Sequence, residues 1–238
     1  VNSCQFSDAK QYSVTVSGPA GSASATNSLT VIDASKMTIN PADVWSGYMN
    51  VTGTAQSSGG FGSGWGVADL NASFSGSLLV LSPNTIGDPN CYWYYNPTFD
   101  CAGAGTNAGA IGAKTMEANM FVESTGVFQG ANVTFSGTVL NTNLLNSMST
   151  NQLGSNWTCI AFIKDFTQNY GTFTRATVDL ATNTSPVFSV TLLTLDDVPG
   201  RHVQIGFATK GPNVWATDPI LPGLGKVVIA PYPAVIIT

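Results

Sequence analysis

Few side chains in this 238-residue sequence could take part in catalysis. The two glutamates, Glu117 and Glu123, lie six residues apart in one run of alternating residues, so they share a face of the predicted strand. At about 3.3 Å per residue they stand about 20 Å apart, whereas the two carboxylates of a glycosidase stand about 5–10 Å apart. We therefore expect two solvated carboxylates, opposite a core-facing row of apolar residues: Met116, Ala118, Met120 and Val122.

The single histidine, His202, would have to serve any Ser-His-Asp triad. It follows a Val-Pro-Gly turn at the start of a predicted strand, and no G-x-S-x-G nucleophile elbow occurs in the sequence. The glycine-rich run 59–66 lacks the lysine of a phosphate-binding loop, and its aromatic residues favour a packed or sticky loop. We expect a structural histidine with a hydrogen-bond partner, and no enzyme activity.

Asp196 and Asp197 form the one candidate metal site that the sequence offers. Adjacent carboxylates with nearby loop carbonyls could hold Ca²⁺, which takes six to eight oxygen ligands. The spacing of an EF-hand is absent, and a solvated acidic turn is the competing interpretation. Calcium apart, the sequence indicates no cofactor.

The four cysteines are Cys4, Cys91, Cys101 and Cys159. An even number of cysteines in a chain with few charges suggests disulfides and an oxidising compartment. Of the three possible pairings we favour Cys91–Cys101, which closes a short loop, and then Cys4–Cys159 by elimination. Zinc is disfavoured, because no two cysteines have the close spacing of a structural zinc site and there is one histidine.

The segment between Cys91 and Cys101 is rich in aromatic residues. Rings on a stiff loop lose little entropy on binding, and their flat faces can stack on the apolar faces of sugars. Aromatic residues are also enriched at protein–protein hot spots, and they can simply cap one end of a core. All three interpretations concern the same predicted platform, which comprises Tyr92, Trp93, Tyr94, Tyr95 and Phe99 together with Trp65 and Trp215 from other loops.

The composition excludes several classes of protein. Charged residues make up 9% of the chain, against about 25% in an average soluble domain, and the net charge is −5. Nucleic-acid binders and proteins held electrostatically on membranes need a basic surface instead. The longest apolar run, residues 227–237, is broken by two prolines and is shorter than the roughly 20 residues of a membrane-spanning helix. The sequence is typical of an extracellular globular protein.

Period-two alternation between turn residues recurs along the chain and predicts an all-β protein. Many short strands at this spacing indicate an antiparallel β-sandwich of the jelly-roll or immunoglobulin-like kind. One weak helical pattern lies over residues 141–152. The predicted strands cover residues 70–81, 116–124, 132–139, 158–166, 186–195, 202–209 and 226–230.

Residues 1–35 differ from the rest. Tyr12-Ser13-Val14-Thr15-Val16, a Gly-Pro-Ala-Gly turn and Ser28-Leu29-Thr30-Val31 resemble the last hairpin of an immunoglobulin-like domain whose preceding strands are absent. A lone hairpin is marginally stable in water, so this one must pair with the sandwich, with an upstream module or with another subunit. We therefore divide the chain into a hairpin segment, 1–35, and a sandwich domain, 36–238.

The sandwich segment resembles a module of exported bacterial multidomain proteins, which has no established activity. The resemblance lies in residues 44–51, 62–70, 116–119, 161–166, 201–207 and 211–215, and the insert 91–101 departs from it. It implies an exported β-sandwich.

Two functions follow as hypotheses. The first is a non-enzymatic structural subunit of an extracellular or cell-surface fibre, joined to copies of itself by β-strand addition through its β-forming ends. The alternative is a carbohydrate-binding or adhesive module that uses the loop aromatics to hold a polysaccharide. A hydrolase that uses Glu117 or His202 is the least favoured.

Overall fold

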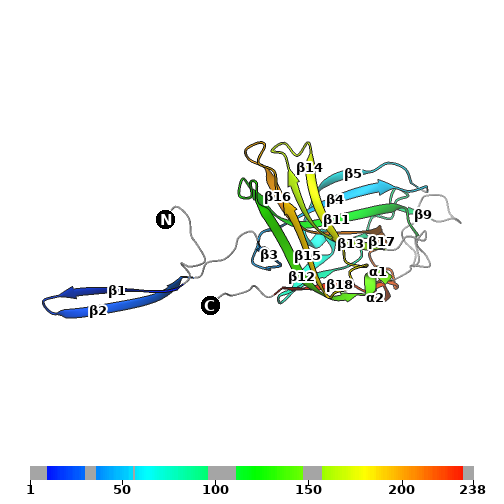
Figure 1. The fold of residues 1–238 in the computed structure, drawn as a ribbon. Helices are drawn as coiled ribbons and strands as arrows, with labels where there is room; N and C mark the ends of the chain where they lie inside the picture. The colour runs from blue at the N-terminus through cyan, green and yellow to red at the C-terminus, as the bar shows by residue number, and fades with distance from the viewer. Residues whose placement is uncertain (1–9, 30–35, 56, 96–110, 147–156, 233–238) are drawn as a thin grey trace.

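The computed structural model describes residues 10–29, 36–55, 57–95, 111–146 and 157–232, which form a β-sandwich and a separate hairpin (Figure 1). The first sheet of the sandwich is antiparallel throughout. Its order is β14 (Phe173–Asp179), β13 (Thr158–Phe166), β16 (His202–Pro212), β11 (Lys114–Thr125), β4 (Trp45–Gly53) and β5 (Phe61–Trp65).

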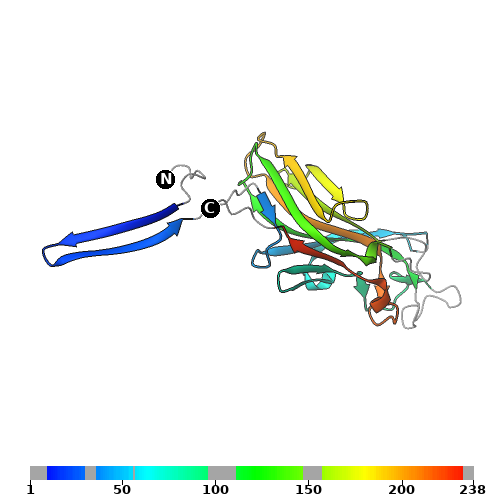
Figure 2. The ribbon, with the colours of Figure 1, turned by 60° about the horizontal axis from the view of Figure 1, so that its bottom comes forward.

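The second sheet faces the first (Figures 1 and 2). The three-residue strand β3 (Lys36–Thr38) also belongs to it and runs parallel to the second strand, β12. The order of the other strands is β15 (Val187–Leu193), β12 (Asn132–Thr142), β18 (Val227–Pro231), β7 (Leu78–Leu81) and β6 (Ala72–Ser75).

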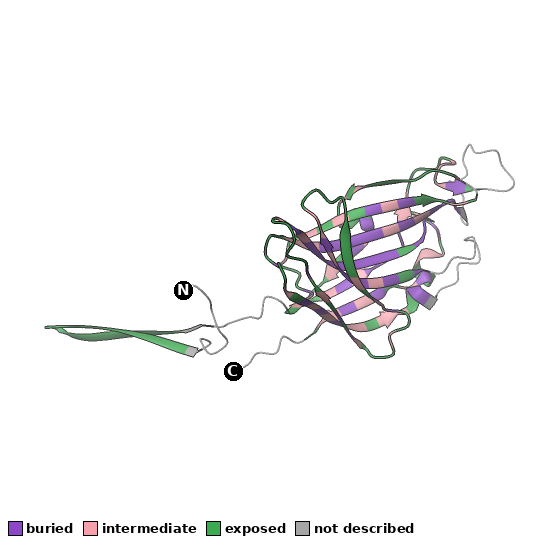
Figure 3. Cartoon of the chain, turned by 45° about the horizontal axis from the view of Figure 1, so that its top comes forward, coloured by how far each residue is buried: buried purple, intermediate pink, exposed green. Residues whose placement is uncertain are grey.

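The core lies between the two sheets, because alternate residues of each strand point inward (Figure 3). Along β11 the even-numbered Met116, Ala118 and Met120 are buried, while Glu117 and Glu123 lie on the outer face, as the alternation predicts. Phe135, Phe188 and Phe207 meet at the centre in edge-on contacts from both sheets.

The hairpin of β1 (Lys10–Gly18) and β2 (Gly21–Leu29) forms a two-stranded sheet of its own. Residues 11–27 are exposed, and the hairpin lies apart from both sheets in two views (Figures 1 and 2). One of its faces, which is mainly apolar, carries Val14 and Val16 opposite Ala25 and Ala23, and Tyr12 opposite Asn27. Over residues 11–27 the other face carries hydroxyl and amide side chains only: Gln11, Ser13, Thr15, Ser17, Ser22, Ser24 and Thr26.

Short strands and helical turns lie outside the two large sheets, at one end of the sandwich. They are the parallel pair β8 (Thr85–Ile86) and β17 (Val214–Trp215), the pair β9 (Tyr94–Tyr95) and β10 (Ile111–Gly112), the 3₁₀ turn η2 (Ala68–Leu70), and the one-turn helices α1 (Asn143–Asn146) and α2 (Leu221–Leu224).

The predicted sandwich is confirmed, with differences in detail. The run 70–81 is two strands, β6 and β7, joined by a tight turn at Gly76, whose φ of 61° suits glycine. The helical pattern over 141–152 gives the four residues of α1, and residues 147–152 lie outside the described residues. The division of the chain at residue 35 falls in the undescribed segment 30–35 and stays a prediction.

A buried ion pair fixes the loop between β15 and β16. The Arg201 guanidinium donates from Nε to Asp165 Oδ1 at 2.8 Å, and from its terminal nitrogens to the Asp165 carbonyl and to Asp197. Asp165 Oδ2 in turn accepts from the Leu195 amide at 2.8 Å. Asp165 and Arg201 are 0% and 2% exposed, so the loop is tied to β13 by charge-assisted hydrogen bonds shielded from water.

Candidate functional site

Aromatic side chains from three separate parts of the chain meet at the end of the sandwich that carries these short strands. Phe61, at the start of β5, makes an edge-on contact with Trp93, and Trp93 makes another with Tyr92. On the other side, Tyr94 of β9 packs edge-on against Trp215 of β17 with ring centroids 5.5 Å apart. The structure therefore brings most of the predicted aromatic residues into one group.

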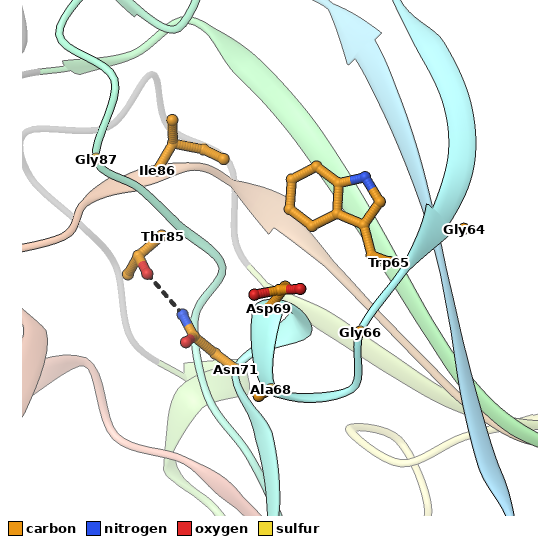
Figure 4. Close-up of a pocket in the computed structure, with 9 residues that line it drawn as sticks. All are labelled: Gly64, Trp65, Gly66, Ala68, Asp69, Asn71, Thr85, Ile86 and Gly87. Atoms are coloured by element: carbon orange, nitrogen blue, oxygen red, sulfur yellow. Dashed lines mark hydrogen bonds between the residues drawn. The ribbon is translucent and has the colours of Figure 1, made fainter.

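A shallow pocket of about 530 Å³ opens beside this group (Figure 4). The Trp65 indole stands on one side and Thr85 and Ile86 of β8 on the other, with Asp69 and Asn71 between them (Figure 4). A flat ring together with a carboxylate, a hydroxyl and an amide is a set that can stack on a ligand and bind its hydroxyl groups.

Local hydrogen bonds hold this set of side chains in place. Trp65 Nε1 donates to Ser63 Oγ at 3.0 Å, which fixes the plane of the indole. Asn71 ends η2 in the left-handed region, at φ 54° and ψ 35°, a conformation that asparagine tolerates. Its Nδ2 donates to Thr85 Oγ1 and to the Pro83 carbonyl, both at 2.8 Å. The pocket is therefore largely preformed.

Lys114 is fully buried beside the aromatic group. Its Nζ donates to the carbonyls of Ser57, Ser58 and Gly59 at 3.1, 2.6 and 2.9 Å. The same ammonium lies 3.8 Å from the centre of the Tyr92 ring, a cation–π contact. Burial lowers the pKa of Lys114, and the carbonyls and the ring compensate for its lost hydration. The loop of residues 57–59, which leads into the glycine-rich run, thus binds the lysine ammonium, a contact that the sequence analysis did not predict.

Tyr94 is a core residue, as the capping interpretation predicted. It is 1% exposed, and its hydroxyl donates to the carbonyls of Ile86 and Val214, at 3.0 Å in the second case. Burial raises the pKa of this phenol well above its ordinary value. Tyr94 joins β8 to β17 and has no free face for a ligand.

The other predicted platform residues differ in exposure. Tyr95 is 39% exposed, and Phe61, which lies against Trp93, is equally so. Tyr92, Trp93, Trp65 and Trp215 are half-buried. Phe99 lies outside the described residues. Within the described part of the chain, the most exposed rings of this set are therefore those of Tyr95 and Phe61, and the half-buried Trp65 lines the pocket.

The predicted disulfides are not seen. The structure holds Cys91 and Cys159 as free thiols, and their predicted partners, Cys101 and Cys4, lie outside the described residues. Cys159 is 0% exposed in the core, and burial raises the pKa of its thiol to about 12. A buried cysteine packs as a small apolar side chain, so a bridge from Cys159 would require its partner to enter the closed core.

His202 and Glu123 belong to a polar network on the outer face of the first sheet. The His202 ring has two partners, Thr125 Oγ1 at 2.8 Å and the Gln168 carbonyl at 3.1 Å, and it stacks on Tyr170. Glu123 accepts from the Tyr170 hydroxyl and from Gln204 Nε2, both at 2.8 Å. His202 is thus the structural histidine that we expected, with one more partner.

At the candidate calcium site, Asp197 Oδ1 accepts from Arg201 at 2.7 Å. A carboxylate already neutralised by a guanidinium is a weaker calcium ligand. Within the part of the chain that the structure describes, no three His, Cys, Asp or Glu side chains gather as a metal site would require.

Comparisons with known proteins add little to the geometry of the chain itself. No protein-family model matches the chain, and no curated protein does either. One solved structure, described as "Structural basis for the promiscuous specificity of the carbohydrate-binding modules from the beta-sandwich super family", matches 94% of this chain and 72% of its own length. The identity is 14% and the TM-score is 0.23. Among the described residues, no helix has the length and apolar character needed to cross a membrane.

Proposed function

We propose that this protein is a non-enzymatic structural subunit of an extracellular or cell-surface assembly, in which the β1–β2 hairpin binds a second copy of the chain. The observation that carries the proposal is the apolar face of the hairpin. Val14 and Val16 are 62% and 69% exposed although they alternate with polar residues as core-facing residues do.

An isolated hairpin is marginally stable in water, because two strands bury too little apolar surface to offset their loss of entropy. This hairpin has nine residues in each strand, with one apolar face and one hydroxyl-rich face. Such a division is typical of a sheet that is covered on one side. A covering partner would therefore stabilise it.

A second copy suits this face for two reasons. Large Val14 and Val16 alternate across the hairpin with small Ala25 and Ala23, so two such faces related by a twofold axis can interdigitate. The described hairpin also carries one charged residue, Lys10, so little like-charge repulsion opposes self-association. Among the described residues no further strand pairs with either edge of the hairpin, so both edges can accept a neighbour's strand.

The test is the solution mass of the full chain, measured by light scattering over a wide range of protein concentrations. We expect a mass that rises with concentration above the 24.7 kDa of one chain, with fibres or clusters visible by electron microscopy. A single 24.7 kDa species at every concentration would refute the proposal.

A second candidate function is binding of a polysaccharide at the pocket beside Trp65. The favouring observation is a preformed hollow that combines an indole face with Asp69, Asn71 and Thr85. Trp65→Ala and Asp69→Ala should each abolish glycan binding measured by calorimetry or on an array. Phe173→Ala is the matched control, because this ring is also exposed but lies on β14 at the opposite edge of the same sheet. Binding that survives both pocket variants would exclude this site.

A further inference from the structure

The outer face of the first sheet holds a lysine and an asparagine that the functions above do not use. Lys164 of β13 and Asn119 of β11 belong to strands separated by β16. In the strand registers, Gly206 of β16 pairs with Phe162 of β13 on one side and with Phe121 of β11 on the other. Lys164 lies two residues after Phe162 and Asn119 two residues before Phe121, so Gly206 lies between the two side chains on this face. Because glycine has no side chain, the Lys164 stem can cross β16 at this point and reach Asn119.

The two side chains are in direct contact. Lys164 Nζ donates to Asn119 Oδ1 at 2.8 Å. Since a carbonyl bond is about 1.23 Å long, Nζ lies at most about 4 Å from the amide carbon Cγ. A displacement of roughly half an ångström brings it to the 3–3.5 Å of a near-attack geometry.

Glu117 stands on the opposite side of the same amide. Its Oε1 accepts from Asn119 Nδ2 at 3.3 Å, and the Glu117 carbonyl accepts from the same nitrogen at 3.2 Å. Asn50 Nδ2 also donates to Oε1 at 3.3 Å and holds the carboxylate in this position. The amide thus has an amine at its oxygen and a carboxylate at its nitrogen.

The Asn119 amide is shielded from water, and Lys164 and Glu117 beside it are half-buried. Asn119 is 2% exposed, and a small apolar group of Phe162 and Phe121, 0% and 8% exposed, lies beside it. Lys164 Nζ stands 4.1 Å from the centre of the Phe162 ring. Burial lowers the pKa of Lys164 to about 8, opposed by the charge of Glu117 and assisted by that of Arg175 on β14. Part of the amine is therefore in its neutral, nucleophilic form near neutral pH.

We propose that Lys164 and Asn119 form an intramolecular isopeptide bond with Glu117 as the acid–base group. Lys164 Nζ attacks Asn119 Cγ, the new C–N bond forms, and the bond from Cγ to Nδ2 breaks. One proton leaves Nζ through the Glu117 carboxylate and passes to Nδ2, which departs as ammonia. The amine and the primary amide become one secondary amide, and no oxidant or other reactant is needed.

Glu117 can serve both nitrogens in this step. In the tetrahedral intermediate, Nζ and Nδ2 are bonded to the same carbon, so a carboxylate that already touches Nδ2 also reaches Nζ. The product would link β13 to β11 across β16 and tie together three adjacent strands of the six-stranded sheet.

Mass spectrometry of the reduced full chain, produced in a bacterial cytosol, tests the proposal. Loss of ammonia lowers the intact mass by about 17 Da. Trypsin cuts after Lys114, Lys164 and Arg175, with no other Lys or Arg between 114 and 175. An amidated Lys164 is not cut, so we expect one peptide, residues 115–175, that is about 17 Da lighter than its sequence. Fragment ions should then locate the bond between positions 119 and 164.

Three variants assign the roles. Lys164→Arg and Asn119→Ala should have the full mass, and Glu117→Gln, which keeps its size, should be slower to link by about 10²–10⁴-fold, the usual contribution of acid–base catalysis. Lys210→Arg is the matched control, because Lys210 lies on the same face opposite Glu117 and should link like the parent. Circular dichroism of each variant checks that it is folded.

Two results would overturn the proposal. The first is a full intact mass with trypsin cleavage after Lys164. The second is a mass loss of about 17 Da with that cleavage retained, because cyclisation of an asparagine to a succinimide releases ammonia without consuming a lysine. A Glu117→Gln variant that is folded and links as fast as the parent would remove Glu117 from the reaction.

Discussion

Replacing both hairpin valines by threonine tests how the copies associate. Threonine has the shape and branching of valine, so Val14→Thr/Val16→Thr keeps the strand propensity and changes the polarity of one face. If the two faces pack against each other, each copy contributes two valines to the contact. We expect the double variant to remain folded and to associate more weakly than the parent.

The exposed fractions set the size of the effect. Burying a whole valine side chain is worth about 1.5–3 kcal/mol. Since Val14 and Val16 are 62% and 69% exposed, covering the exposed part is worth about 1–2 kcal/mol for each residue. Four valines then contribute about 4–8 kcal/mol to a twofold contact, and threonine retains about half of this. The loss of about 2–4 kcal/mol raises the dissociation constant by about 30- to 700-fold.

Sedimentation equilibrium over a concentration series measures this constant. Thr15→Ser is the matched control, because Thr15 lies between the valines on the hydroxyl-rich face and serine keeps its hydroxyl for Ser24. We expect the control to change the constant by no more than about twofold. Equal weakening by the control and by the double variant would show that the apolar face does not direct association.

Three further predictions concern the sandwich. Arg201→Met should lower the free energy of unfolding in urea by about 3–5 kcal/mol, because Asp165 is left charged and buried, and adding Asp165→Leu should restore most of it. Asn84→Leu should raise that free energy by about 1 kcal/mol, because the fully buried Asn84 amide has no hydrogen-bond partner. Cys159 should resist iodoacetamide in the native protein and react in urea without reductant, whereas no reaction in urea would indicate a disulfide. Because its folded pKa is raised to about 12 from 9.0, stability should fall as the pH rises from 9.0 towards 12, and Cys159→Ala should remove this component.

Most strands that have one clearly apolar face could be predicted from the sequence, because that face lies in the core. β11 and β12 alternate between apolar and polar residues along most of their length, and the burial follows the same alternation. The edge strands β5 and β14 were missed, and so was the inner strand β4. β5 reads Phe-Gly-Ser-Gly-Trp, and the first three residues of β14 are exposed, so neither sequence shows a clear buried face.

The candidate sites were predictable only in part. The aromatic residues could be grouped by their position in loops, but their burial depends on the pairing of β8 with β17, whose residues are about 130 positions apart. Lys114 binds carbonyls 55–57 residues away, and Lys164 meets Asn119 across an intervening strand. Such contacts depend on strand order, which no local spacing in the sequence encodes.

The attachment of the hairpin to the sandwich has a mechanical consequence. A pull on the hairpin enters the sandwich through β3, which pairs with β12 over three residues, Lys36–Thr38, and accepts one further bond at Thr38 Oγ1 from the Tyr232 amide. The strands that hold the core have pairings of up to 11 residues. Under tension β3 should detach first and lengthen the connection, while the two sheets stay folded. The joint between the connecting element and the sandwich should therefore yield before the two large sheets, and β3 can pair with β12 again when the tension is released.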